Sequence, residues 1–128
     1  MRNRFRAAKL AKKAYMRRKK YFDNWRYYAK VIKDLATKEL GEVKVIVFGS
    51  VVKGDYHPAL SDIDVLIVSP NMPESNLERA KIKVRILDRI GKWNPFEIHL
   101  VKNMNGIENS YYWISTLRSS LPGALNIS

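Results

Sequence analysis

The fold is decided by residues 44–69, which read KVIVFGSVVKGDYHPALSDIDVLIVS. The apolar, β-branched runs within residues 43–48 and 62–68 predict two buried strands that flank a polar loop. Side chains alternate along a strand, so Asp62 and Asp64 are expected on one face, which becomes apolar further along. This stretch therefore predicts a sheet with an acidic site at one end.

The rest of the chain predicts helices and one more strand around these two strands. The expected elements are a helix with Asp23 as its N-cap that ends at Gly41, a helix with Pro73 in its first turn that ends at Gly91, a strand at residues 96–101, and a last helix beginning near Ile107. A Leu-Pro-Gly tail is expected to be loose. The order helix, strand, short helix, strand, helix, strand, helix indicates an α/β fold with a small mixed sheet flanked by helices.

Composition limits the kind of protein. The chain has 128 residues and no Cys, which excludes a disulfide framework and a cysteine-based zinc site. A reducing cytoplasm is therefore the expected location. The length predicts one domain with a sizeable core. The apolar runs are strand-sized, well short of the ~20 residues of a membrane-spanning helix, so we expect no membrane insertion.

Positive charge is concentrated at the N-terminus. The net charge is +12, and residues 1–40 hold 14 Lys/Arg against 3 Asp/Glu, whereas residues 41–128 hold 10 against 9. Residues 2–20 carry ten Lys/Arg and no acid, yet their small apolar residues follow a helical period. We expect a basic helical extension over residues 1–22 and a single domain over residues 23–128. The extension is either a solvated or partner-docked helix, or a basic arm for RNA or an acidic lipid surface.

The Gly-Ser turn after the first strand is the candidate phosphate site. Gly49 lets the backbone come close to a ligand, and Ser50 offers a hydroxyl and a backbone N–H. If a short helix opens at Ser50, its free N–H groups favour a polyphosphate, and Lys53 adds a cation. A Gly-Ser turn by itself is weak evidence, because many tight turns contain one.

Three acidic residues are the candidate metal ligands. Asp62 and Asp64 supply the carboxylates that Mg²⁺ prefers, and their mutual repulsion favours a bound cation. A pair of exposed Asp residues at the start of a strand is the simpler interpretation, but the flanking run is almost wholly apolar. Glu97 lies inside an otherwise apolar strand, where an unpaired acid is unfavourable. If the third strand lies beside the second, Glu97 completes a three-carboxylate cluster for two metal ions.

Other polar and aromatic residues are weaker candidates. His57 sits in the polar loop and is expected to be a surface histidine. His99 shares the face of Glu97 and is a candidate to support the metal ligands. Tyr111, Tyr112 and Trp113 would line the nucleotide pocket or, at least for Tyr111, pack in the core.

These motifs together resemble a known family. The Gly-Ser turn, eleven intervening residues, the Asp-Ile-Asp triplet and a later strand with a lone acid are similar to the DNA polymerase beta nucleotidyltransferase superfamily, and most similar to its minimal nucleotidyltransferase branch. The resemblance covers roughly residues 24–118. Lys53 stands where these proteins often have Arg, and Glu97 stands where many have Asp.

The resemblance implies roles for the candidate residues. Asp62 and Asp64 would bind two Mg²⁺ ions, and Glu97 would bind the catalytic metal and help to deprotonate the acceptor hydroxyl. Gly49 and Ser50 would hold the triphosphate. The implied reaction is an in-line attack by a hydroxyl on the α-phosphorus of ATP or another NTP, with pyrophosphate as the leaving group.

Two functions from different classes follow. The first is an enzyme like a protein adenylyltransferase, which moves AMP onto a hydroxyl of a partner macromolecule. The minimal branch resembles the antitoxin half of a toxin–antitoxin pair whose partner is a helical HEPN-type nuclease, and from a length of 128 residues we expect no second domain for a small acceptor. The alternative is a non-catalytic protein that masks a partner or RNA through its basic arm. A homo- or hetero-oligomer is compatible with both.

Overall fold

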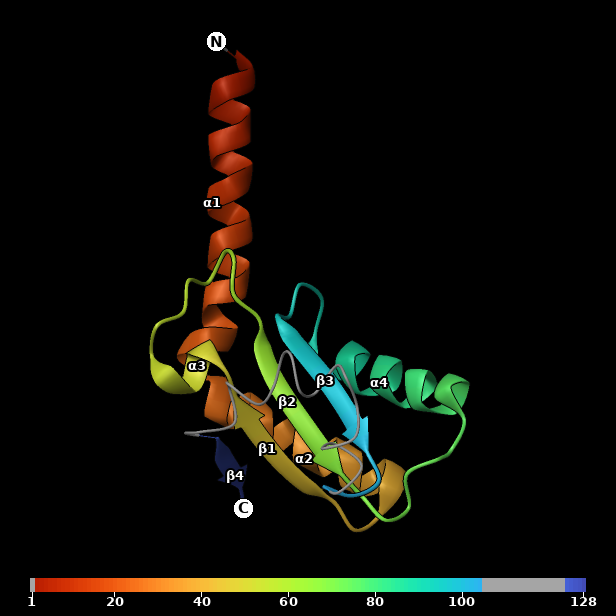
Figure 1. Ribbon diagram of the computed structural model, residues 1–128. Helices are drawn as coiled ribbons and strands as arrows, with labels where there is room; N and C mark the ends of the chain where they lie inside the picture. The colour runs from red at the N-terminus through yellow and green to blue at the C-terminus, as the bar shows by residue number, and fades with distance from the viewer. Residues whose placement is uncertain (1, 105–123) are drawn as a thin grey trace.

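The computed structural model describes residues 2–104 and 124–128. The elements in chain order are α1 (Arg2–Asp23), α2 (Trp25–Leu40), β1 (Lys44–Phe48), α3 (Ser50–Lys53), β2 (Ile63–Val68), α4 (Asn76–Ile90), β3 (Phe96–Val101) and β4 (Leu125–Ile127). Figure 1 shows them as a small sheet with helices beside it and α1 extending away. The predicted α/β class, the mixed sheet and the N-terminal helix are confirmed.

The sheet has the strand order β3-β2-β1-β4. β1 runs antiparallel to both β2 and β4, whereas β2 and β3 are parallel. In this register Asp64 faces Phe48 on one side and Glu97 on the other. The third strand therefore lies beside the second, which was the condition for Glu97 to approach the Asp residues.

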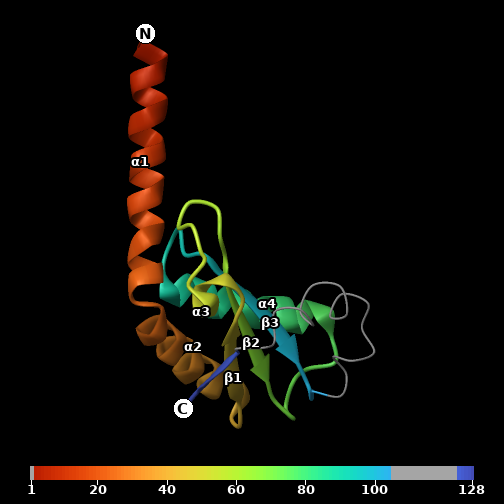
Figure 2. The same cartoon turned by 60° about the vertical axis from the view of Figure 1, so that its left-hand side comes forward.

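The two faces of β2 have different surroundings. Ile63, Val65 and Ile67 are fully buried and belong to the main core, which also holds apolar residues of α2 and α4. Leu66 belongs to a second cluster on the opposite face, together with Phe48. Figure 2 shows α2 and α4 on one side of the sheet. The alternation predicted for this strand is correct, and it puts Asp64 on the face of Leu66, away from the two helices.

The two ends of α1 have different surroundings. Tyr21 and Phe22 are each 1% exposed and lie in the main core, whereas all side chains of residues 4–14 are exposed. In Figures 1 and 2 this N-terminal part extends beyond the sheet. None of the described helices has the length and apolar composition needed to cross a bilayer. The C-terminal end of α1 is therefore part of the folded core.

Two local predictions need correction. Asp23 is the last residue of α1 rather than the N-cap of α2, and its carboxylate accepts a hydrogen bond from Lys19 instead. Asn24 occupies the N-cap position of α2, because the two helices are separated by this one residue, and its side chain donates to the carbonyl of Lys20 rather than capping α2. Helix α4 begins three residues after Pro73, where the hydroxyl of Ser75 accepts a hydrogen bond from a first-turn N–H.

The C-terminal prediction was incomplete. Residues 125–127 form β4, which pairs with β1, although no strand was expected there. A three-residue strand is too short for alternation to be recognised. The helix expected near Ile107 and the Leu-Pro-Gly segment lie outside the described residues.

Phe22 and Phe5 provide a matched test of whether the C-terminal end of α1, and not its N-terminal part, belongs to the folded core. Phe22→Ala removes a buried ring and is expected to lower the free energy of unfolding by about 3–5 kcal/mol. Phe5 is 77% exposed, so Phe5→Ala should change it by no more than about 0.5 kcal/mol. Urea unfolding followed by circular dichroism measures both. Equal effects of the two substitutions would contradict this difference between the two ends of α1.

Candidate functional site

Gly49 forms the turn between β1 and α3. Its backbone has φ 89° and ψ −157°, a conformation that side-chain-bearing residues rarely adopt. A Cβ built on Gly49 would lie only 2.8 Å from Oδ2 of Asp64. Glycine is therefore required twice, for the turn itself and for the close approach of the Asp64 carboxylate.

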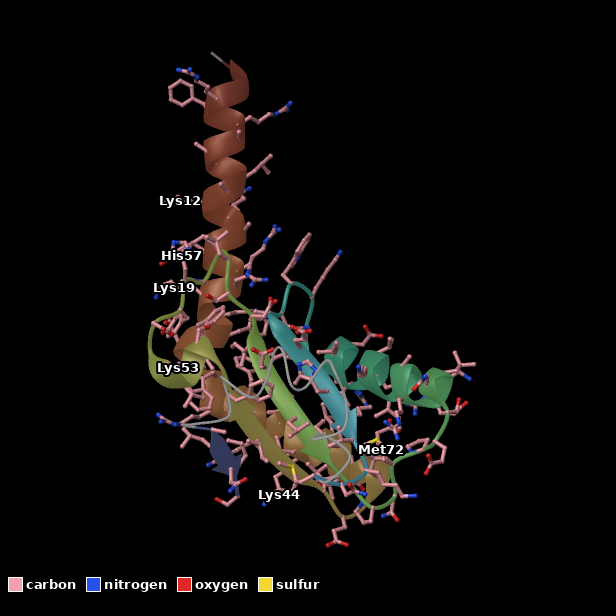
Figure 3. All side chains as sticks on the ribbon, viewed as in Figure 1. Lys12, Lys19, Lys44, Lys53, His57 and Met72 are labelled. Carbon is pink, nitrogen blue, oxygen red and sulfur yellow. The ribbon has the colours of Figure 1, made fainter. Side chains whose placement is uncertain are left out.

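The expected short helix opens directly after this turn. Ser50 is its first residue and is partly buried, and the exposed Lys53 is its last. Figure 3 shows Lys53 beside this helix, at the edge of the molecule. The secondary structure agrees with the prediction, and the contact of Gly49, Ser50 and Lys53 with a nucleotide stays a prediction.

Two parallel strands bring acidic and imidazole groups together. Asp64 on β2 and Glu97 on β3 are register partners, and His99 lies two residues further along β3 on the same face. Each of these three side chains offers one ligand atom, and these atoms lie within 4.8 Å of one another. Nε2 of His99 is 3.5 Å from Oδ1 of Asp64. We refer to Asp64, Glu97 and His99 as the metal cluster.

The metal cluster fits a divalent cation. It combines two carboxylates, which suit hard cations such as Mg²⁺ or Mn²⁺, with an imidazole, which suits ions such as Zn²⁺. Glu97 is exposed and Asp64 is partly buried, so solvent reaches the acidic part, while His99 is only 9% exposed. The ring of Phe48 lies 5.7 Å from the His99 ring, centroid to centroid, and supports it from β1.

Asp62 lies outside the metal cluster. It precedes the first residue of β2, and its side chain is 57% exposed. Its Oδ1 is 3.6 Å from Nη2 of Arg18, which comes from α1. The structure thus brings together Asp64 and Glu97 from the predicted acidic set, and the metal-binding role of Asp62 stays a prediction.

The two histidines differ from each other. His57 is exposed, its Nδ1 accepts a hydrogen bond from the backbone of Ala59, and its ring centroid is 6.2 Å from that of Tyr15 on α1. Figure 3 shows His57 beside α1, at the level between Lys12 and Lys19. His99 was expected only to support the ligands, whereas its ring nitrogen is one of the three clustered donors. The sequence contained a signal for this role of His99, because His99 lies two residues after Glu97 on one strand and therefore shares its face.

The aromatic residues predicted near the nucleotide, Tyr111, Tyr112 and Trp113, lie outside the described residues.

Comparison with known families gives the site its context. Residues 28–121 match the model of the nucleotidyltransferase domain, which is well over half of the chain. The chain belongs to this nucleotidyltransferase family. No curated protein matches it. Membership in the family implies an NTP substrate and the transfer of a nucleoside monophosphate, and the metal cluster lies within the matched range.

The matched range also separates the nucleotidyltransferase domain from the helix before it. Helix α1 ends at Asp23, so it lies entirely outside residues 28–121. Its contact with Asp62 is therefore a feature that the family match does not include.

Gly49 and Gly54 provide a matched test of the approach to Asp64. Both have positive φ, but a Cβ on Gly54 would meet no atom within 4 Å. Either Ala variant is expected to lose about 1–3 kcal/mol of unfolding free energy through backbone strain. Only Gly49→Ala also displaces the Asp64 carboxylate, so it alone should weaken Mn²⁺ binding, by at least about tenfold. Electron paramagnetic resonance measures free Mn²⁺ directly, and equal affinities in the two folded variants would contradict this geometry.

Proposed function

We propose that the protein transfers AMP from ATP onto a hydroxyl group of a partner macromolecule. One observation carries the proposal: Asp64 and Glu97 converge from neighbouring strands next to Gly49, within a chain that belongs to the nucleotidyltransferase family. Any enzyme of this kind must hold a metal-bound triphosphate at an acidic site.

We assign the residues of the site separate roles in metal binding, proton transfer and phosphate binding. Asp64 and Glu97 would hold Mg²⁺, with Asp62 as a further ligand for a second ion. Bound magnesium supplies charge neutralisation at the phosphates. Glu97 is exposed, and we assign it the additional task of accepting the proton of the attacking hydroxyl. Gly49 and Ser50 would contact the triphosphate through the backbone, and Lys53 would add positive charge.

The acceptor that we favour is a protein. An exposed Glu97 is accessible to a hydroxyl on a folded surface as well as to one on a small molecule. The motif spacing resembles the minimal nucleotidyltransferases that act as antitoxins, so the proposed acceptor is a helical HEPN-type nuclease encoded next to this protein. Modification of a hydroxyl in the active centre of such a nuclease would silence it.

Labelled ATP tests this proposal. The full chain, Mg²⁺, α-³²P-ATP and the product of the neighbouring gene are incubated together, and label on that product is expected. Asp64→Asn keeps the shape of the side chain but removes its charge, and should lower labelling at least about a hundredfold. Asp88→Asn, an exposed change on α4, is the control and should keep full activity. Equal labelling with Asp64→Asn, or none with the unaltered chain, would contradict the proposal.

A basic face on α1 favours RNA binding as a second candidate function. Arg6, Lys9, Lys13 and Lys20 recur at helical spacing, on the side opposite to Arg18. Arg18 contacts the rest of the domain, so these four side chains point away from it. Residues 6–20 span about 21 Å at a rise of ~1.5 Å per residue, long enough to follow several phosphates.

Salt dependence tests this second function. Replacing all four residues with Gln should weaken binding of a single-stranded RNA oligonucleotide. It should also reduce the slope of log affinity against log salt by about 3, because each lost phosphate contact removes ~0.7. The charge-matched control replaces exposed basic residues elsewhere, namely Lys30, Lys38, Lys44 and Arg89. The same loss in both variants would indicate non-specific attraction, and binding of the partner protein without RNA binding would make the arm a protein contact.

A further inference from the structure

Helix α1 contacts the loop of residues 54–62, which connects α3 to β2. Three residues at i, i+3 and i+7, which share one helical face, make the contacts: Tyr15, Arg18 and Phe22. The ring of Tyr15 meets His57 edge to face, and that of Phe22 stacks on Tyr56 with centroids 4.9 Å apart. The loop leads directly into Asp62 and β2, so α1 touches the segment that carries a predicted metal ligand.

Arg18 makes hydrogen bonds between α1 and this loop. Its Nε donates to the carbonyl of Pro58 at 2.7 Å, and its Nη2 donates to the carbonyl of Ser61. The same Nη2 lies 3.6 Å from Oδ1 of Asp62. The planar guanidinium therefore bridges two carbonyl groups of one loop and reaches the carboxylate at its end, a geometry that the point charge of Lys cannot reproduce.

We propose that Arg18 is a positioning residue of the nucleotidyltransferase site, which holds the loop of residues 54–62 so that Asp62 can join the metal cluster. The proposal rests on the proposed function, because it treats Asp62 as a metal ligand. It also gives α1 a role in positioning a residue of the site, although α1 precedes the range that matches the family.

Two effects of Arg18 on a bound cation oppose each other. Its positive charge repels a cation near Asp62, so removal of the charge alone would strengthen metal binding. Its hydrogen bonds to the loop reduce the freedom that Asp62 must lose on binding, so removal of these bonds would weaken it. The contacts to the carbonyl groups are shorter than the ion pair, and the Asp62 side chain is more than half exposed, where charge effects are screened. Positioning should therefore dominate, and the sign of the change distinguishes the two effects.

Three variants of the full chain test the proposal without nucleotide or acceptor. Arg18→Met removes both charge and hydrogen bonds, and Arg18→Lys keeps the charge but loses the two-point contact. Arg17→Met is the control on the same helix, because the Arg17 guanidinium lies over the ring of Trp93, 5.2 Å from its centroid. Thermal unfolding establishes that all three are folded.

The first measurement is amide hydrogen exchange of the loop. The N–H groups of Leu60 and Ser61 both donate to the carbonyl of His57 and report on the order of this loop. Both Arg18 variants should exchange about tenfold faster at these amides, and Arg17→Met should not differ from the unaltered chain. Unchanged exchange in Arg18→Met would overturn the proposal.

The second measurement is Mn²⁺ affinity, which a purely structural contact would leave unchanged. Both Arg18 variants should bind Mn²⁺ about tenfold more weakly. Tighter binding by Arg18→Met alone would identify Arg18 as a competitor of the metal, and faster exchange with unchanged affinity would identify a structural contact only. Either result overturns the proposal. Neither measurement requires catalysis, so a failure of AMP transfer would be recognised separately.

Discussion

The site depends on the parallel pairing of β2 with β3. This pairing fixes Asp64 beside Glu97, and a shift by one residue would turn one of the two carboxylates to the helix-covered face of the sheet. The register is held by burial, because Ile63, Val65 and Ile67 are fully enclosed on that face. Apolar packing on one side of the sheet thus determines the position of the charges on the other.

The sequence predicted this part of the molecule well because its signals are local and periodic. The alternation in β2 put Asp64 on the face of Leu66, and the lone acid in β3 indicated a functional position. A Gly-Ser turn after a buried strand indicated the short helix α3. Such patterns follow from the two-residue repeat of a strand and from backbone freedom at glycine, so they can be recognised without knowledge of the tertiary structure.

Long-range features were not predictable in the same way. The excess of Lys and Arg in α1 indicated a basic helix, but nothing in the spacing showed that Arg18 reaches Asp62, 44 positions later. The three residues of β4 obtain their strand conformation from pairing with β1, which sequence periodicity cannot reveal. The boundary between α1 and α2 was misplaced by one residue because Asp23 and Asn24 are both good caps.

We expect Asp64 and Glu97 to hold one divalent cation between adjacent strands. Anomalous diffraction from crystals soaked with Mn²⁺ and a non-hydrolysable ATP analogue tests it most directly. An anomalous peak is expected within bonding distance of carboxylate oxygens from both residues, next to the Gly49 turn. A manganese ion bound elsewhere, or a peak that contacts neither carboxylate, would contradict a metal site between these strands.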